Sequence, residues 1–265
     1  MTDPLFVLDT IRENTPLTSD ELHAGWNLTL PDTVRRHAVQ VMRLRGGDAL
    51  QLSDGSGLRV RATLVDPAQG IARVNEVGRE PRPTTRLALI QALAKTGRDE
   101  QAIDMATQIG VDGVIPWQAE RSIAKWKEGR SDRKWRQTLG AATEQSRRAW
   151  VPELGPCSSS KQVLAMCRRA SVHGDLVIVL HQDATTTWGD IEERVSALAQ
   201  RCLADGRERT ISVVVGPEGG ISEREITQFA GAGAQVCVLG STIMRASSAG
   251  PVALALLSRA LGRFA

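Results

Sequence analysis

Short apolar runs alternate with segments of helical periodicity through most of the chain after residue 85. The runs are bounded by polar or Gly-containing stretches, as is typical of strands buried on both faces of a sheet, and they fall at 86–93, 113–116, 175–180, 211–215 and 235–239. Between them, apolar residues at helical spacing predict helices at 98–109, 132–148, 161–170 and 191–203. A helix is also predicted after Ser222, where Glu225 completes a capping box, and an apolar helix follows residue 249. This alternation predicts an α/β domain with a largely parallel sheet.

Residues 1–78 have a different pattern, in which short apolar segments are separated by turn-forming residues. Strands are predicted at 5–8, 49–52, 58–65 and around 71–77, and residues 31–42 have helical spacing. The segment 79–85 contains two prolines and has no periodicity, which is typical of a linker. We therefore predict a small β-rich domain at 1–78, a linker at 79–85 and the α/β domain at 86–265.

The composition is that of an ordinary globular protein and excludes few functional classes. With 265 residues, 42% of them hydrophobic and 24% charged, the chain can build one large or two modest globular domains. The amino-terminal residues lack the pattern of a secretory signal, and no window approaches eighteen apolar residues, so we expect a cytoplasmic protein without a membrane partner. The net charge of +3 is compatible with RNA binding but equally with many other functions.

The cysteines argue against a metal site. Cys157, Cys167, Cys202 and Cys237 are far apart, and none has a second Cys or a His at metal-ligand spacing. In a cytosolic protein such residues are expected to be reduced and partly buried thiols.

The run Gly216-Pro217-Glu218-Gly219-Gly220 follows a predicted buried strand and leads into a predicted helix. Adjacent glycines permit positive φ and let a ligand approach the backbone. The run matches neither the P-loop pattern nor the dinucleotide fingerprint, and Glu218 would repel a phosphate, so a ligand with a positive centre suits it better. A second loop, 240–249, follows the next strand, and the two loops should meet at the sheet edge where open α/β sheets bind ligands. The alternative for the first loop is a tight turn without a ligand.

These residues resemble the SPOUT methyltransferases, and most closely the bacterial small-subunit ribosomal RNA uracil-N3 methyltransferase family, the RsmE family. The resemblance rests on the run 216–220 and on a later segment, 239–245. It extends upstream to five further segments: 95–98, 110–116, 120–122, 144–148 and 151–153. The chain departs from the family's pattern at Gln108, where Glu is more usual, and at 246–249, where Ala-Ser-Ser-Ala replaces Thr-Glu-Thr-Ala.

The resemblance implies an amino-terminal PUA-like β-barrel that binds RNA, followed by a SPOUT (α/β knot) domain with a carboxyl-terminal trefoil knot. It also implies a homodimer in which a second subunit completes the site. The implied reaction transfers a methyl group from S-adenosylmethionine to uracil N3 of 16S ribosomal RNA, with the 30S subunit as the expected partner. Two alternatives remain open: a SPOUT enzyme that methylates a ribose 2′-hydroxyl of ribosomal or transfer RNA, and an RNA-binding homologue without catalysis.

The same resemblance assigns the site residues. Arg245 is the predicted catalytic cation, because negative charge builds on O2 and O4 when uracil N3 loses its proton. The alternative is a structural Arg that pairs with Glu218 or a helix end. Cofactor contacts are predicted at Leu180, His181, Val215, Gly216, Pro217, Glu218, Gly219, Gly220, Leu239, Gly240, Ile243, Met244 and Ser247. Ser247 stands where the family often has Glu, so no general base is assigned; Ser247 and Ser248 are alternatively caps of the last helix.

RNA contacts are predicted at Arg35, Arg36, Arg43, Lys95, Arg98, Arg121, Arg147 and Arg148. Trp126 and Trp135 lie among basic residues and are candidates for stacking on RNA bases, with packing against helices as the alternative. His181 has a similar alternative, since a lone His after a strand is often a packing or surface residue.

Overall fold

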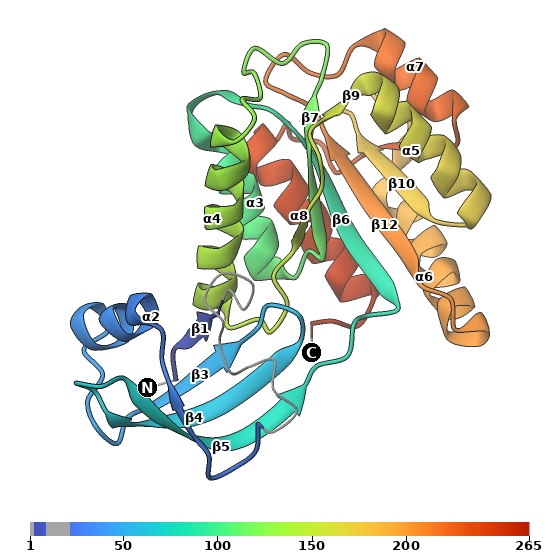
Figure 1. The fold of residues 1–265 in the computed structure, drawn as a ribbon. Coiled ribbons are helices and arrows are strands. Elements are labelled where there is room, and N and C mark those ends of the chain that lie inside the picture. The colour runs from blue at the N-terminus through green and yellow to red at the C-terminus, as the bar shows by residue number, and fades with distance from the viewer. Residues whose placement is uncertain (1–2, 9–21, 265) are drawn as a thin grey trace. The chain divides into compact units, whose positions relative to one another are not determined.

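The structure is a computed structural model that describes residues 3–8 and 22–264 (Figure 1). The chain divides into two compact units. One comprises residues 1–82 together with 140–151, and the other comprises residues 83–139 together with 152–265. The predicted boundaries at 78 and 85 stay a prediction, although strand β5 ends at Arg79 and strand β6 begins at Thr85.

The first unit contains a five-stranded sheet in the order β1-β3-β4-β5-β2. Its strands are β1 (Leu5–Val7), β2 (Asn27–Thr29), β3 (Ala49–Ser53), β4 (Leu58–Asp66) and β5 (Ile71–Arg79). The pair β1–β3 is parallel and the other pairs are antiparallel. Alternate residues of β4 are buried, so one face of the sheet supplies the core of this unit.

Two features of this unit differ from the sequence prediction. The helical segment is an α-helix, α2 (Asp32–Arg36), that continues as a π-helix, η2 (His37–Val41). Strand β2 was not predicted, because only Leu28 of its three residues is buried and three residues are too few to display alternation.

Residues 140–151 are held to this sheet by backbone and side-chain hydrogen bonds. The Gly57 amide donates to the Ala149 carbonyl at 3.0 Å, and Trp150 Nε1 donates to the Glu80 carbonyl at 3.1 Å. Glu144 Oε1 accepts from the Val7 amide at 2.9 Å, and burial raises the pKa of the Glu144 carboxyl. Glu144 thus has a structural task in this unit.

The second unit is built on an eight-stranded sheet whose described pairs are all parallel. The main path runs β11-β13-β10-β12-β6-β7-β8, and β9 also pairs with β7. The strands are β6 (Thr85–Ala92), β7 (Gly113–Gln118), β8 (Glu153–Leu154), β9 (Ser158–Ser159), β10 (Leu176–Leu180), β11 (Thr186–Thr187), β12 (Arg209–Val215) and β13 (Gln235–Val238). The predicted α/β domain with a parallel sheet is confirmed.

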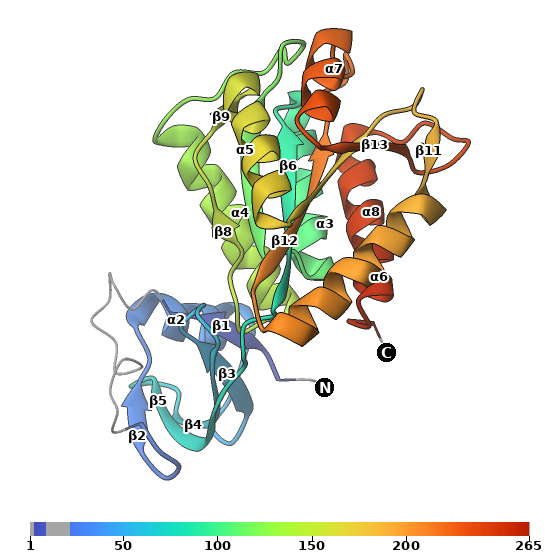
Figure 2. The same ribbon diagram turned by 90° about the vertical axis from the view of Figure 1, so that its right-hand side faces the viewer.

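Helices cover both faces of this sheet (Figure 2). They are the short 3-10 turn η3 (Lys95–Gly97), α3 (Arg98–Ile109), α4 (Arg130–Ser146), α5 (Ser160–His173), α6 (Trp188–Asp205), α7 (Glu223–Gly231) and α8 (Ala246–Ala260). Helix α8 packs on β6, β12, α3 and α6, whereas α5 packs against α7 and β10. Helix α8 lies so close to β6 that a Cβ on Gly250 would be 2.8 Å from a Leu89 methyl carbon.

The predicted helix at 132–148 has the right length but lies two residues too far along the chain, because α4 spans Arg130–Ser146. Helix α4 ends at Ser146, because Arg147 has a φ of 56° and leaves the right-handed helical region.

The sheet order brings distant loops together. Strand β10 lies between β12 and β13, with Val179 opposite Val214 and Leu180 opposite Cys237. Because the three strands are parallel, the loops after Leu180, Val215 and Val238 leave the same edge of the sheet.

Candidate functional site

A cavity of about 940 Å³ lies at this sheet edge, within the second unit. Its walls come from the loops after β10, β12 and β13 and from Arg98 and Arg121. The lining includes all the predicted cofactor contacts except Ser247: Leu180, His181, Val215, Gly216, Pro217, Glu218, Gly219, Gly220, Leu239, Gly240, Ile243 and Met244. Arg245 lines the same cavity. Its volume is within the range of about 300–1,000 Å³ that is usual for ligand pockets.

The loop 216–220 needs glycine at specific positions. Gly220 has a φ of +73° and donates its amide to the Pro217 carbonyl at 2.9 Å, closing a tight turn. At Gly216 a Cβ would lie 2.6 Å from Ile221 Cγ1, so the backbone approaches that side chain too closely for any larger residue. The turn leads directly into α7 through Ser222.

The predicted capping box at the start of α7 is confirmed. The Glu225 amide donates to Ser222 Oγ at 3.2 Å, and the Ser222 amide donates to Glu225 Oε2 at 3.0 Å. Glu225 is fully buried, and its Oε1 also accepts from the Glu120 amide at 2.9 Å and from the Ser160 hydroxyl. Ser222 Oγ in turn donates to Glu120 Oε2 at 2.7 Å, and this bond lowers the pKa of the Glu120 carboxyl. These contacts fix the loop against the segments after β7 and β9.

Glu218 joins the glycine loop to the loop after β6. Its Oε1 accepts from the Lys95 amide at 2.9 Å and lies 3.5 Å from Arg98 Nη1. Glu218 therefore pairs with Arg98, and the alternative in which Arg245 pairs with Glu218 is wrong. Arg98 therefore neutralises part of the negative charge of Glu218 at the wall of this cavity.

The loop after β13 presents its side chains to solvent and to the cavity. Ile243 is 79% exposed, and a Cβ added to Gly240 would meet nothing within 4 Å. Arg245 is exposed, and its guanidinium makes no hydrogen bond or ion pair with any residue that the structure describes. This leaves a cation available at the cavity wall.

The predicted roles of Ser247 and Ser248 as helix caps are wrong. The N-cap of α8 is Arg245, whose carbonyl accepts from the Ser248 and Ala249 amides at 2.9 and 3.0 Å. The chain enters the helix at Ala246, so both serines already lie inside the first turn. Ser247 is buried, at 4% exposure, and is not part of the cavity wall.

His181 is oriented by its neighbours. Its amide donates to the Cys237 carbonyl at 2.9 Å, and its Nδ1 accepts from the Asp183 amide at 3.3 Å. This contact fixes the orientation of the imidazole ring at the end of β10. Gln182 and Asp183 also line the cavity. The sequence prediction missed them, although their position directly after His181 at a strand end was the available signal.

Comparison with known proteins identifies the family. A family model described as an RNA methyltransferase domain matches residues 80–258, and a model described as an RNA methyltransferase PUA domain matches residues 30–73. The chain belongs to this RNA methyltransferase family. The predicted fold class, a PUA-like β domain ahead of an α/β methyltransferase domain, is confirmed.

Relatives of this methyltransferase in several bacteria share one name. Ribosomal RNA small subunit methyltransferase E of Mycobacterium bovis is 36% identical over 223 residues, which cover 82% of this chain and 80% of that protein. The protein of the same name from Bacillus subtilis is 25% identical over 248 residues, which cover 91% and 93%. The predicted membership of the RsmE family is therefore confirmed.

Solved structures have the same fold. Ribosomal RNA small subunit methyltransferase E from Neisseria gonorrhoeae, crystallised with S-adenosyl methionine, aligns with a TM-score of 0.77 at 24% identity, covering 97% of this chain and 98% of that one. A methyltransferase from Legionella pneumophila in complex with the same cofactor aligns with a TM-score of 0.76 at 25% identity, covering 98% of both chains.

The predicted RNA-binding residues of the methyltransferase are divided between the two units. Lys95, Arg98 and Arg121 belong to the second unit, where Arg121 Nη1 donates to the Gly219 carbonyl at 3.2 Å. The others, Arg35, Arg36, Arg43, Arg147 and Arg148, belong to the first unit. In that unit Arg35 pairs with Asp32 at 3.1 Å, and the Arg147 carbonyl accepts from Arg59 Nη2 at 2.9 Å.

The two tryptophans considered for base stacking differ in exposure. Trp135 is 1% exposed, so it packs in the core and cannot stack on RNA. Trp126 is half-buried and meets the Trp135 ring in a T-shaped arrangement, with centroids 5.4 Å apart. Stacking on RNA remains open for Trp126 alone.

The four cysteines are free thiols, of which Cys167, Cys202 and Cys237 are buried. Burial raises the pKa of Cys167 to about 11 and of Cys237 to about 12, so both are protonated at neutral pH. Within residues 3–8 and 22–264 no group of three or more His, Cys, Asp or Glu side chains could hold a metal ion. Over the same ranges, no helix combines the length and apolarity needed to cross a membrane.

Proposed function

We propose that the protein transfers a methyl group from S-adenosylmethionine to uracil N3 of 16S ribosomal RNA. The observation that carries the proposal is the cavity formed by loops 216–220 and 239–245, which lies within the segment matched by the RNA methyltransferase model. The shared name of the relatives supports a small-subunit ribosomal RNA substrate.

The residues present fit this cofactor. The cavity combines apolar walls, such as Leu180, Val215 and Ile243, with carbonyl and amide groups of glycine loops that a ligand can approach closely. The open space beside Gly240 supports the same assignment. When bound, the cofactor supplies a methyl group already activated on a sulfonium, so the protein's task is to position the acceptor and to exclude water.

Arg245 is the residue proposed to stabilise the reacting base. As uracil N3 loses its proton, negative charge develops on O2 and O4, and a permanently charged guanidinium at the cavity wall can stabilise it. The exposed and unpaired state of Arg245 within the described chain supports this role. Ser247 is buried outside the cavity wall, which argues against a cofactor contact or a proton-accepting role for it.

Substitution of Arg245 tests this mechanism. We expect Arg245→Ala to lower kcat by about a hundredfold or more, the usual scale for one electrostatic donor, while the cofactor Kd changes little. Single-turnover methylation and isothermal titration calorimetry measure the two quantities, and Arg259→Ala, an exposed arginine at the far end of α8, is the matched control. An unchanged rate for Arg245→Ala removes this residue from the mechanism.

The product decides between the candidate activities. Ribosomal RNA from a deletion strain should lack 3-methyluridine, and the purified protein should restore it, as measured by nucleoside mass spectrometry. Loss of a 2′-O-methyl nucleoside instead would support the ribose methyltransferase. Absence of any heat with millimolar S-adenosylmethionine would support the RNA-binding homologue without catalysis.

The assembly is also part of the proposal. We infer a homodimer in which a second subunit covers the exposed Ile243 side of the cavity, and a carboxyl-terminal trefoil knot around the cofactor loops. We infer an assembled 30S particle as the substrate, in the cytoplasm. Sedimentation of the purified protein tests the dimer, and parallel assays on free 16S RNA and on 30S particles test the substrate.

A further inference from the structure

A second, smaller cavity of about 150 Å³ opens in the methyltransferase unit. Its lining includes Trp126, the acidic residues Asp99 and Glu100, and the basic residues Lys125 and Lys134. None of these residues belongs to the site described above.

The two cavities are neighbours because they are lined by the same two segments. Arg98 lines the first cavity, while Gly97 and Asp99 on either side of it line the second. In the same way Arg121 lines the first cavity, and the segment 124–126 lines the second. A strand of RNA whose target base enters the first cavity therefore passes close to the second.

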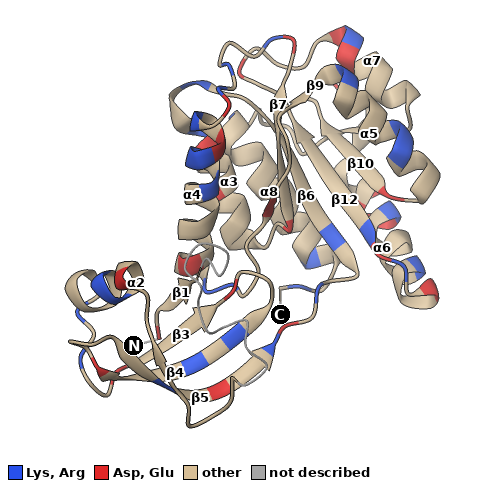
Figure 3. Cartoon of the chain, viewed as in Figure 1, with Lys and Arg blue, Asp and Glu red and all other residues tan. Residues whose placement is uncertain are grey.

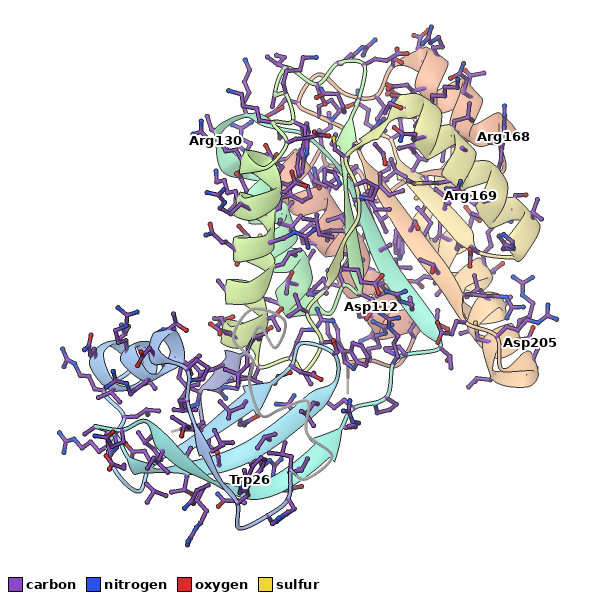
Figure 4. The ribbon with its side chains drawn as sticks, in the orientation of Figure 1. Trp26, Asp112, Arg130, Arg168, Arg169 and Asp205 are labelled. Carbon is purple, nitrogen blue, oxygen red and sulfur yellow. The ribbon has the colours of Figure 1, made fainter. Side chains whose placement is uncertain are left out.

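The loop after β7 and the start of α4 supply part of the wall of the second cavity, and this segment, residues 125–136, is rich in cations; we call it the rim. Apart from Lys134, which pairs with Glu100, its exposed basic residues are Lys125, Lys127, Arg130, Arg133 and Arg136. None of the five makes an ion pair with another residue in the described part of the chain. Figure 3 shows Lys and Arg gathered at the upper end of α4, and Figure 4 places Arg130 there. Such a group of unpaired cations attracts a polyanion.

The acidic residues lie deeper than the cations. Asp99 is 7% exposed and the Glu100 side chain is 19% exposed, whereas the side chain of Lys134, which pairs with Glu100 at 2.7 Å, is 62% exposed. A phosphate is therefore repelled from the interior but attracted to the rim. A nucleobase, which is uncharged and carries hydrogen-bond donors, suits the interior.

Trp126 supplies a fixed aromatic surface at this position. Its ring rests against the buried Trp135 ring, and its backbone amide donates to Gln118 Oε1 at 3.3 Å. An aromatic ring that is already held in place loses little entropy when a base stacks on it.

We propose that this second cavity binds the unpaired base of a nucleotide next to the methylated one. The base stacks on Trp126, and the rim cations Lys125, Lys127 and Arg130 bind the adjoining phosphates. The proposal rests on the proposed RNA methyltransferase function and assigns to it a second nucleotide-binding site.

The first test measures methylation kinetics with an RNA oligonucleotide or 30S substrate that the wild-type protein methylates. We expect Trp126→Ala to raise the KM for RNA between about 5-fold and 150-fold, the range found for loss of one base–aromatic stack, with kcat and the cofactor Kd unchanged. Trp126→Phe should recover most of the affinity, which separates stacking from a folding defect. An unchanged KM for Trp126→Ala would overturn the proposal.

The second test removes the neighbouring base instead of the tryptophan. An abasic site placed on one side or the other of the target should weaken wild-type binding at one of these positions and have no further effect on Trp126→Ala. Additive effects at both positions would contradict the proposal, because independent losses mean that the base and the ring do not touch.

The third test addresses the cationic rim. Arg130→Ala should lower the slope of log Kd against log salt concentration by about one, and Arg168→Ala, an exposed arginine on α5, should leave it unchanged. Equal slopes for the two variants would overturn the assignment of the rim. A wild-type protein that methylates no RNA would instead remove the proposed function, so the two failures are distinguishable.

Discussion

At the scale of single residues, the buried carboxylate of Glu225 holds the glycine loop of this methyltransferase in place through hydrogen bonds. Glu225 has no exposed surface, yet both of its oxygens accept hydrogen bonds from the segments that adjoin the glycine loop 216–220. The sequence predicted its capping partner, Ser222, because a capping box is local. It could not predict the bonds from Glu120 and Ser160, because those residues are distant in sequence and only the folded sheet brings them near.

Asp99 makes folding stability depend on pH. Burial, reinforced by the neighbouring Glu100 charge, raises the pKa of Asp99 from 3.8 to about 6. The folded protein therefore holds this proton more tightly than the unfolded chain, and the stability that the protonated form contributes is lost as pH rises through about 6. Relative to wild type, Asp99→Asn should gain about 1–3 kcal/mol in the free energy of unfolding between pH 4 and pH 8.

Urea denaturation of both proteins across that pH range measures the gain. Glu193→Gln, which removes an exposed charge on α6, corrects for the general effect of one fewer negative charge. A difference between Asp99→Asn and wild type that stays constant with pH would contradict the shifted pKa.

At the scale of elements, the sequence predicted what short-range patterns determine. The long strands β6, β10 and β12 were identified from apolar runs, and the turn after β12 from its glycines. The short strands β8, β9 and β11 were missed, because each has two residues and exists only through pairing with a neighbouring strand. The end of α4 was misplaced because the positive φ of Arg147 has no signal in residue type.

The turn after β12 carries a prediction at this scale. Gly220 has a φ of +73°, which a residue with a Cβ adopts only at a cost of about 1–3 kcal/mol. Gly220→Ala should therefore lower Tm and raise the Kd for S-adenosylmethionine, because the turn forms part of the cavity wall. Gly231→Ala, at the end of α7 and with open space around the added Cβ, is the control. If the two substitutions had equal effects on cofactor binding, the strained turn would have no role in the site.

At the scale of the whole molecule, the site arises from the order of parallel strands. Leu180, Val215 and Val238 are far apart in the chain, but their strands are adjacent, so three loops surround one cavity. The family resemblance supplied most of the lining residues in advance. Neither pattern nor resemblance indicated that Arg98, and not Arg245, pairs with Glu218, since that pairing depends on where the loop after β6 lies. The predicted domains were continuous stretches of chain, so they could not include the finding that residues 140–151 belong to the same unit as residues 1–82.

Arg263, in the segment after α8, makes contacts that are expected to affect the stability of the fold but not cofactor binding. Arg263 donates to the Gly110 carbonyl at 3.1 Å, to Asp112 Oδ2 at 3.1 Å and to the Thr85 carbonyl, so it ties the segment after α8 to the starts of β6 and β7 (Figure 4 labels Asp112). These contacts lie at the amino ends of parallel strands, and the cavity proposed to bind the cofactor lies at the carboxyl ends. Arg263→Ala leaves the Asp112 carboxylate, whose side chain is 10% exposed, without this cation.

We expect Arg263→Ala to cost about 1.5–3 kcal/mol in the free energy of unfolding, because it removes a charge-assisted hydrogen bond to the largely buried Asp112 carboxylate and two hydrogen bonds to backbone carbonyls. Chemical denaturation measures this loss, and Arg259→Ala again serves as the exposed control. At temperatures where both variants remain folded, the Kd for S-adenosylmethionine should equal that of wild type, since the cavity wall is untouched. A weakened cofactor Kd in the folded Arg263→Ala variant would mean that the two ends of the sheet are energetically coupled, and that the site is not positioned by its strand-end loops alone.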